Sequence, residues 1–314
     1  MENLVFTFGI VAPVFLIVAV GYLLKVIGLM NDNFINISSK IVFSIALPAL
    51  IFLELYNLDF SKVFEIGQIG YIYLGTLFAF FVTWFVSSLF IHNGKDRGVF
   101  IQGSFRSNYA IVGLAILSGL VGKLGFGKAS LFLVFMIPLY NTLAVIALTV
   151  PLRKEKQLNL NSTLQEIIKN PLILAVLISL PFAFFKIPIH PVFLETGKYI
   201  ADIALPLALI NIGATLNFKD IKKASLLAFY STLLKIIIFP ALVTYGAVLL
   251  GYKGDDLAII FVLFACPTAV VSYIMAEAMG SNGKLAGNIV LATTLGSVVT
   301  ITLGLFILKT AGLI

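Results

Sequence analysis

Six polar side chains interrupt a long apolar stretch at residues 98–121, and they are Gln102, Ser104, Arg106, Ser107, Asn108 and Tyr109. Asn108 lies eleven residues after Arg97, which in a helix is a depth of about 16 Å. That depth is near the middle of a ~30 Å hydrocarbon layer. In lipid, a polar group needs a partner inside the protein or in a water-filled cavity. We therefore predict that this stretch faces the protein interior and a ligand.

A second apolar stretch, residues 256–279, carries Pro267 near its middle, followed by Thr268 and Ser272. An internal proline removes a backbone hydrogen bond and breaks or kinks a helix. Two broken helices that cross at the membrane centre would present two helix N-termini, each with partial positive charge and free N–H groups. Such a centre suits a carboxylate. We predict that Pro267 and Thr268 form the half of the site opposite Asn108, with Ser107 and Ser272 as further candidates.

The composition is that of a polytopic membrane protein. Of 314 residues, 60% are hydrophobic and 11% charged, whereas soluble domains have about 45–50% and 25%. Apolar runs of about 20 residues recur along the chain, which predicts an all-α protein of ten transmembrane helices. Their expected limits are 4–27, 34–56, 68–91, 98–121, 128–150, 170–186, 197–216, 224–250, 256–279 and 284–308. The net charge of +7 is spread over loops, which gives no sign of nucleic-acid binding.

The two halves of the chain are related. Residues 40–60 and 198–218 share the block Ile-Ala-Leu-Pro, so that Pro206 follows Pro48 by 158 residues. The same offset joins Pro13 to Pro171, Gly122 to Gly280 and Asn108 to Cys266. Each repeat holds five segments, an odd number, so the second repeat must enter the membrane from the opposite side. We predict repeats at 1–151 and 170–314, joined by a cytoplasmic linker at 152–169.

Loop charges give an orientation. Twelve lysines and arginines fall on the side that holds Lys25 and the linker, and seven fall on the other side. Because positive loops favour the cytoplasm, both termini are predicted to lie outside a cell (inner) membrane.

Several stretches together resemble the auxin efflux carrier family. They are the run GYLLKVIGLMNDNFINISSKIVFSIALPALIF, Arg-Ser-Asn-Tyr at 106–109, Asn-Pro-Leu at 170–172, Lys235 with Pro240, and Cys-Pro-Thr-Ala at 266–269. The resemblance implies the fold of sodium/proton antiporters and bile-acid symporters, with crossed broken helices 4 and 9. It also implies a scaffold of helices 1, 2, 6 and 7, a mobile transport domain of helices 3–5 and 8–10, and a homodimer through the scaffold. Plant members export auxin, and prokaryotic members are associated with malate, malonate and similar acids. Carried over from the family, the Asn108 amide would donate to a substrate carboxylate.

The sequence departs from the plant carriers in two ways. The loop between the halves is short, as in prokaryotic relatives, and residues 101–120 contain no proline. A break in the fourth segment must therefore come from Asn108, its flanking serines and Gly113.

Charged residues within the apolar segments leave alternatives open. Arg106 could attract the anion, or it could pair with Glu54, Asp202 or backbone carbonyls. Lys235 could stand in for a coupling cation, as lysines do in some proteins of the implied fold, or its long side chain could snorkel to the membrane surface. Asp202 could carry a proton or form a salt bridge at a loop edge.

The remaining candidates accompany prolines. Asn141 follows Pro138 and Asn211 follows Pro206, and either amide could line the cavity. Pro48 and Pro206 are predicted hinges in the wall opposite the crossing.

The predicted function is secondary transport of a small organic anion by elevator-type alternating access. A sodium- or proton-coupled symporter, or a cation/proton antiporter, is the alternative. The fourth and ninth segments carry no carboxylate beside their breaks, which argues against cation exchange but leaves coupling to sodium or protons open. No ATP-binding or zinc-hydrolase motif is present, so neither an enzyme, a cofactor nor a metal is expected.

Overall fold

The computed structural model describes residues 2–56, 65–152, 171–216 and 226–314. Within these ranges the chain is helical apart from turns and one isolated β-bridge. The predicted linker lies outside the described residues except for Leu152, as do several basic residues that set the predicted orientation.

The first half of the chain contributes helices in five successive groups. They are α1 (Glu2–Val26); α2 (Asp32–Ile41), the π-turn η1 (Val42–Ala46) and α3 (Leu47–Tyr56); α5 (Ile66–Phe90); α6 (Gly94–Phe105), the π-turn η2 (Tyr109–Gly113) and α7 (Leu114–Leu120); and α8 (Lys123–Thr149) with the 3₁₀ turn η3 (Val150–Leu152).

The second half has the same order. It comprises α10 (Pro171–Phe184); α11 (Pro191–Asp202) and α12 (Ala204–Thr215); α13 (Leu226–Leu233), the π-turn η5 (Leu234–Ile238) and α14 (Phe239–Leu249); α15 (Gly254–Ala265) and α16 (Val271–Ala278); and α17 (Gly283–Thr310).

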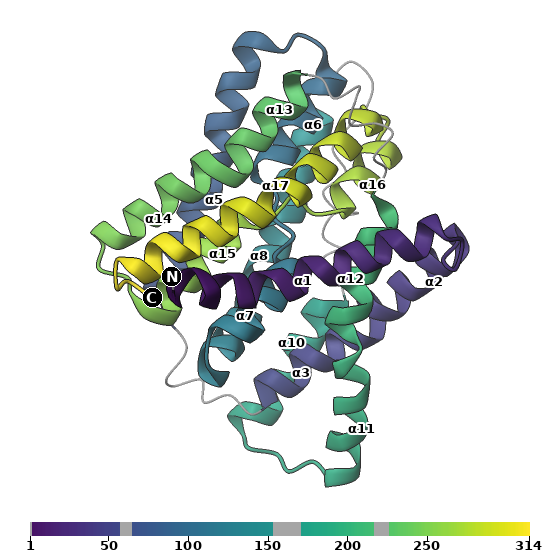
Figure 1. The fold of residues 1–314 in the computed structure, drawn as a ribbon, viewed down its shortest axis with the longest axis vertical. Coiled ribbons are helices and arrows are strands. Elements are labelled where there is room, and N and C mark those ends of the chain that lie inside the picture. The colour runs from purple at the N-terminus through teal and green to yellow at the C-terminus, as the bar shows by residue number, and fades with distance from the viewer. Residues whose placement is uncertain (1, 57–64, 153–170, 217–225) are drawn as a thin grey trace.

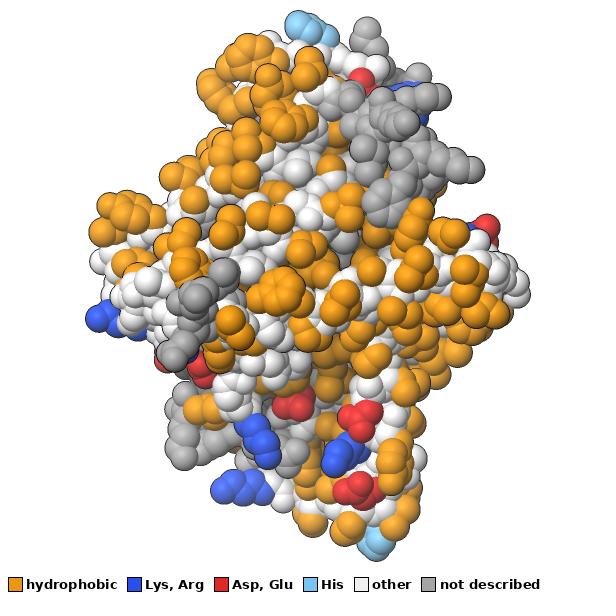
Figure 2. All heavy atoms as spheres, in the orientation of Figure 1, with side chains coloured by type: hydrophobic (Ala, Val, Ile, Leu, Met, Phe, Trp, Pro, Cys, Tyr) orange, Lys and Arg blue, Asp and Glu red, His pale blue; other side chains and the backbone are white. Residues whose placement is uncertain are grey.

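In the part of the chain that the structure describes, six helical stretches are long and apolar enough to cross a membrane, which confirms a polytopic membrane protein. They are Val5–Val26, Asp32–Tyr56, Ile66–Phe90, Lys123–Leu152, Leu226–Leu249 and Gly283–Thr310. The other four predicted spans are α10 and three stretches that the chain divides, at residues 106–108, 203 and 266–270. Hydrophobic side chains cover much of the molecular face in Figure 2, and most of the charged ones in view lie in its lower part; a broad apolar band is expected of a surface that meets lipid.

Prolines explain where several helices deviate. Pro48 follows η1, Pro240 follows η5, and Pro206 follows the turn at Ile203 between α11 and α12. A proline ring clashes with the carbonyl four residues earlier and removes one hydrogen bond, and a π-turn accommodates that loss. Pro48 and Pro206 thus stand beside backbone irregularities, and their action as hinges remains a prediction.

The helix α1 packs directly on α12 (Figure 1). A Cβ atom added at Gly213 would clash with the carbonyl oxygen of Val18, and one added at Gly21 would clash with that of Ile210. Small residues allow this backbone-to-backbone approach. The two termini lie side by side, with the Asn3 amide 3.4 Å from the Thr310 hydroxyl (Figure 1). The α1–α12 pair therefore forms a closely packed framework next to the crossing described below.

Candidate functional site

Both predicted helix breaks are present. The helix α6 ends at Phe105 and the chain resumes helical structure at Tyr109, while α15 ends at Ala265 and α16 begins at Val271. Because α6 and α15 both have 12 residues and end 160 residues apart (265 minus 105), Asn108 corresponds to Thr268. The sequence offset of 158 had matched Asn108 with Cys266, which is wrong by two residues.

The two breaks hold each other together. Ser107 and Thr268 form an antiparallel β-bridge, and the Asn108 N–H donates to the Pro267 carbonyl at 2.8 Å. The Ser107 hydroxyl donates to the Leu263 carbonyl at 2.6 Å, in the last turn of α15. Reciprocally, the Thr268 hydroxyl donates to the carbonyl of Gly103 at 2.6 Å, in the last turn of α6. Each break thus satisfies carbonyl groups that the other helix leaves open.

Lys235 completes the C-terminal end of α15. Its side chain is 2% exposed, and its ammonium donates to the Phe264 carbonyl at 2.7 Å. Because the following Pro267 and Thr268 do not continue the helix, this carbonyl has no intrahelical partner, and a cation favours the negative end of the helix dipole. The buried position excludes the interpretation that Lys235 snorkels to the membrane surface.

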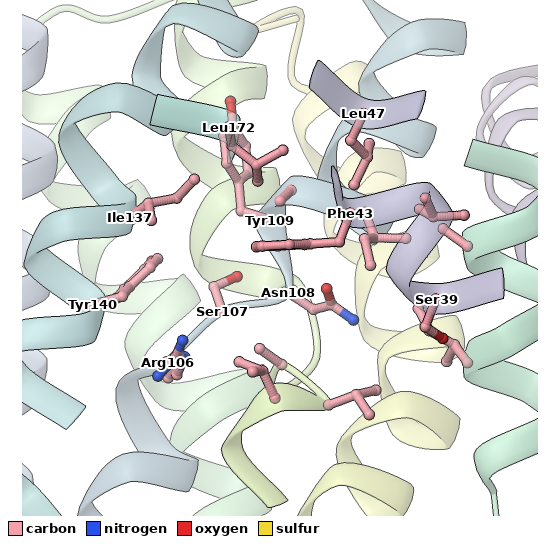
Figure 3. A pocket seen from close by; sticks show the side chains of 18 of the residues that line it. Ser39, Phe43, Leu47, Arg106, Ser107, Asn108, Tyr109, Ile137, Tyr140 and Leu172 are labelled. Atoms are coloured by element: carbon pink, nitrogen blue, oxygen red, sulfur yellow. The ribbon is translucent and has the colours of Figure 1, made fainter. Parts of the chain in front are cut away.

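A cavity of about 500 Å³ lies beside the crossing. Figure 3 shows Arg106, Ser107 and Asn108 on the unwound stretch, with Ser39, Phe43 and Leu47 on one side and Ile137 and Tyr140 on the other. Five of the residues named from the sequence line this cavity: Arg106, Ser107, Asn108, Asn141 and Asn211. Most of the remaining wall is apolar, as in other small-molecule pockets.

The Arg106 guanidinium is buried at one end of this polar stretch. One nitrogen, Nη2, donates to Asn141 Oδ1 at 2.8 Å, and Nη1 lies 2.8 Å from Met275 Sδ. Among the described residues, Arg106 makes no ion pair, so the predicted alternatives of pairing with Glu54 or Asp202 are wrong. Within the described ranges its contacts are thus a neutral amide and a thioether, neither of which carries the negative charge that would balance the guanidinium.

Two helix starts also line the cavity. Tyr109–Ile111 begin η2, and residues 269–271 lead into α16. The first N–H groups of a helix have no acceptor within it and carry partial positive charge. The sequence placed this role on Pro267 and Thr268, whereas Ala269 and the two valines after it supply the second start.

The other predicted site residues lie away from the cavity wall: Pro267, Thr268, Ser272, Lys235, Asp202, Pro48 and Pro206. Pro267 and Thr268 build the crossing, and Ser272 is buried in α16, where its hydroxyl has no hydrogen-bond partner among the described residues. Asp202 is exposed at the end of α11. Asn211, which the sequence named beside Asn141 as a possible lining residue, does line the cavity, from α12. Its position five residues after Pro206 was the available signal.

Comparisons with known proteins identify a family. Residues 6–305 match a family described as membrane transport protein. An uncharacterized transporter of Methanothermobacter thermautotrophicus is 22% identical, over 93% of this chain and 95% of that protein. One from Methanocaldococcus jannaschii is 25% identical, over 94% and 96%. A protein of Rhizobium meliloti named "Putative malonate transporter" is 25% identical, over 97% of both chains.

Proposed function

The chain belongs to the membrane transport protein family, the auxin efflux carrier family, and we propose that it is a secondary transporter of a small organic anion. The observation that carries this proposal is the cavity at the crossing, where two helix starts, the Asn108 amide and the Arg106 guanidinium meet. All of these groups donate hydrogen bonds or carry positive charge, so they favour a carboxylate.

Arg106 strengthens the choice of an anion. A cation within the membrane is costly unless it is paired or faces water, and the described residues give this guanidinium no acidic partner. A substrate carboxylate in the cavity would supply the missing negative charge. The apolar wall, which includes Phe43 and Ile137, would hold the carbon skeleton. Candidate substrates are auxin-like monocarboxylates and short dicarboxylates, including the malonate named for the Rhizobium relative.

The order of helices supports the inverted five-plus-five repeat. The broken pair α6–α7 corresponds to α15–α16, the long α5 to α13–α14, and α8 to α17. In this arrangement the two breaks cross at the membrane centre. The scaffold would comprise α1, α2, α3, α10, α11 and α12, and the remaining helices would form the transport domain.

The cavity lies where these two proposed domains meet. Leu172 and Thr215 line it at the helix ends that adjoin residues 153–170 and 217–225 in the sequence. These connections carry the excess of positive charge that marks the cytoplasm. In this proposal the cavity faces the cytoplasm and both termini lie outside, and elevator-like movement of the transport domain would open the site to the other side. The family resemblance further supports a homodimer through the scaffold.

Uptake of labelled acids into proteoliposomes tests this function. We expect saturable flux of at least one mono- or dicarboxylate from a panel that includes malonate, malate and indole-3-acetate. Flux that rises with an imposed sodium or proton gradient would identify the coupling ion. Cation/proton exchange without saturable flux of any acid would refute the proposal.

A further inference from the structure

A second amide faces the candidate substrate from the scaffold side. Asn211 of α12 lines the cavity and is 5% exposed. Its side-chain oxygen accepts a hydrogen bond from the Ser38 hydroxyl at 2.9 Å. Its side-chain nitrogen, Nδ2, is buried and has no hydrogen-bond partner among the described residues. An amide nitrogen can only donate, so the unmet need at this position is for an acceptor.

Buried donors without an acceptor are rare because their desolvation is not compensated. Asn211 lines the cavity, so a ligand there is the acceptor that its nitrogen could reach, while its oxygen is bound by Ser38. We propose that Asn211 is a second substrate-binding residue, which donates to the anion held by Asn108 when the cavity has the form seen here. This inference rests on the transport function proposed above.

The two amides belong to parts of the fold that are anchored differently. Asn108 lies on the unwound stretch, tied to Pro267 by its backbone. Asn211 lies two residues before Gly213, where α12 is in backbone contact with α1. When the transport domain moves relative to the scaffold, Asn108 travels with the substrate and Asn211 stays behind. Asn211 therefore raises substrate affinity on the cytoplasmic side alone, whereas Asn108 contributes on both sides.

Transport measured separately from each face of the membrane tests this difference. For Asn211→Ala, we expect KM on the cytoplasmic face to rise about tenfold, because the substrate loses one hydrogen bond to its charged group. On the opposite face, KM should change less than twofold. Asn108→Ala should raise KM on both faces. A purely structural role for Asn211 would instead lower the amount of active protein and leave both KM values equal to wild type.

Three further variants sharpen the test. Asn211→Asp keeps the shape but replaces the donor with a negatively charged acceptor, so cytoplasmic KM should rise more than for Asn211→Ala. Ser38→Ala frees the amide to rotate and should give an intermediate rise. Asn288→Ala is the matched control, because Asn288 is also a buried asparagine with an amide atom, its oxygen, that has no partner within the described ranges, but it lies away from the cavity wall. Its KM should equal that of wild type on both faces.

The outcomes separate this inference from the transport function itself. Absence of saturable anion flux in the wild-type protein would refute the transport function. Normal wild-type flux with an unchanged cytoplasmic KM in Asn211→Ala would refute the role of Asn211 alone. A wild-type KM in Asn211→Asp would also overturn it, because the amide would then be presenting its oxygen. Equal rises on both faces would show that Asn211 moves with the substrate.

Discussion

Asn108 and Thr268 occupy corresponding positions in the two breaks, and the structure predicts opposite consequences of truncating them. The side-chain amide of Asn108 lines the cavity and forms no hydrogen bond to another described residue, while its backbone N–H binds Pro267. The Thr268 hydroxyl instead binds the buried Gly103 carbonyl at 2.6 Å. We therefore expect Asn108→Ala to impair substrate binding and Thr268→Val to impair stability.

The magnitudes follow from the bonds that each variant loses. A hydrogen bond to a charged group contributes about 1.5–3 kcal/mol, so Asn108→Ala should raise KM about 10- to 100-fold. It keeps the backbone bond to Pro267, so the melting temperature should stay within about 1 °C of wild type. Thr268→Val keeps the side-chain shape but leaves the Gly103 carbonyl unpaired, which costs about 1–3 kcal/mol. The melting temperature should then fall by about 2–10 °C.

Both quantities can be measured on the same purified preparations. Thermal unfolding in detergent gives the melting temperature, and uptake by proteoliposomes gives KM, normalised to reconstituted protein. Asn108→Asp provides a second test, because it preserves volume but places a carboxylate where the substrate carboxylate should bind, and it should abolish uptake. If Asn108→Ala lowered the melting temperature as much as Thr268→Val and left KM unchanged, Asn108 would be a structural residue and the assignment of the site would be wrong.

Three other predictions concern packing, charge and access. Gly213→Ala should lower the melting temperature by several degrees, because the added methyl group would clash with a backbone carbonyl of α1. Gly9→Ala in α1 is the control and should leave the melting temperature unchanged, because its methyl group would enter open space. Equal melting temperatures for the two variants would contradict the close contact between α1 and α12. Lys235→Met should destabilise the protein by about 1–3 kcal/mol in the same assay, because the Phe264 carbonyl at the end of α15 loses its hydrogen-bond donor. Wild-type stability of this variant would contradict a capping role for Lys235. Cys266 is fully buried and should resist a membrane-impermeant thiol reagent. A cysteine introduced by Ala110→Cys in the cavity wall should react with the reagent, and bound substrate should protect it. Fast labelling of Cys266 would contradict its burial and place it in the cavity.

The broken helices were predictable because polar groups are rare in membrane segments, where each of them needs a partner. Asn108 and Arg106 stood out against their apolar surroundings, and Pro267 cannot continue a helix. The composition of the site was harder to predict, since the helix starts that line it offer backbone N–H groups, which no residue type reveals. Residues 269–271 read Ala-Val-Val, which gives no polar signal, yet they form one of the two helix starts.

Pairing across the fold was equally hidden in the sequence. Thr268 and Ser107 are the residue types expected of a binding site, but their hydroxyl groups are used by carbonyls of the opposite helix. Arg106 pairs with Asn141, although both Glu54 and Asp202 were available by charge. A hydroxyl or a charge in a membrane segment indicates that a partner exists, and the three-dimensional arrangement decides whether that partner is substrate or protein.

The absence of proline from α6 has a physical explanation in the crossing. A helix ends when its backbone groups find better partners elsewhere, and at this position the partners come from the other break. The Pro267 carbonyl accepts the Asn108 N–H, and the Thr268 hydroxyl takes the carbonyl of Gly103. Pro267 therefore interrupts its own helix directly. It also interrupts α6 indirectly, because its break allows the β-bridge between Ser107 and Thr268 to form. The two breaks depend on each other, so the crossing is a structure that neither half of the chain can form alone.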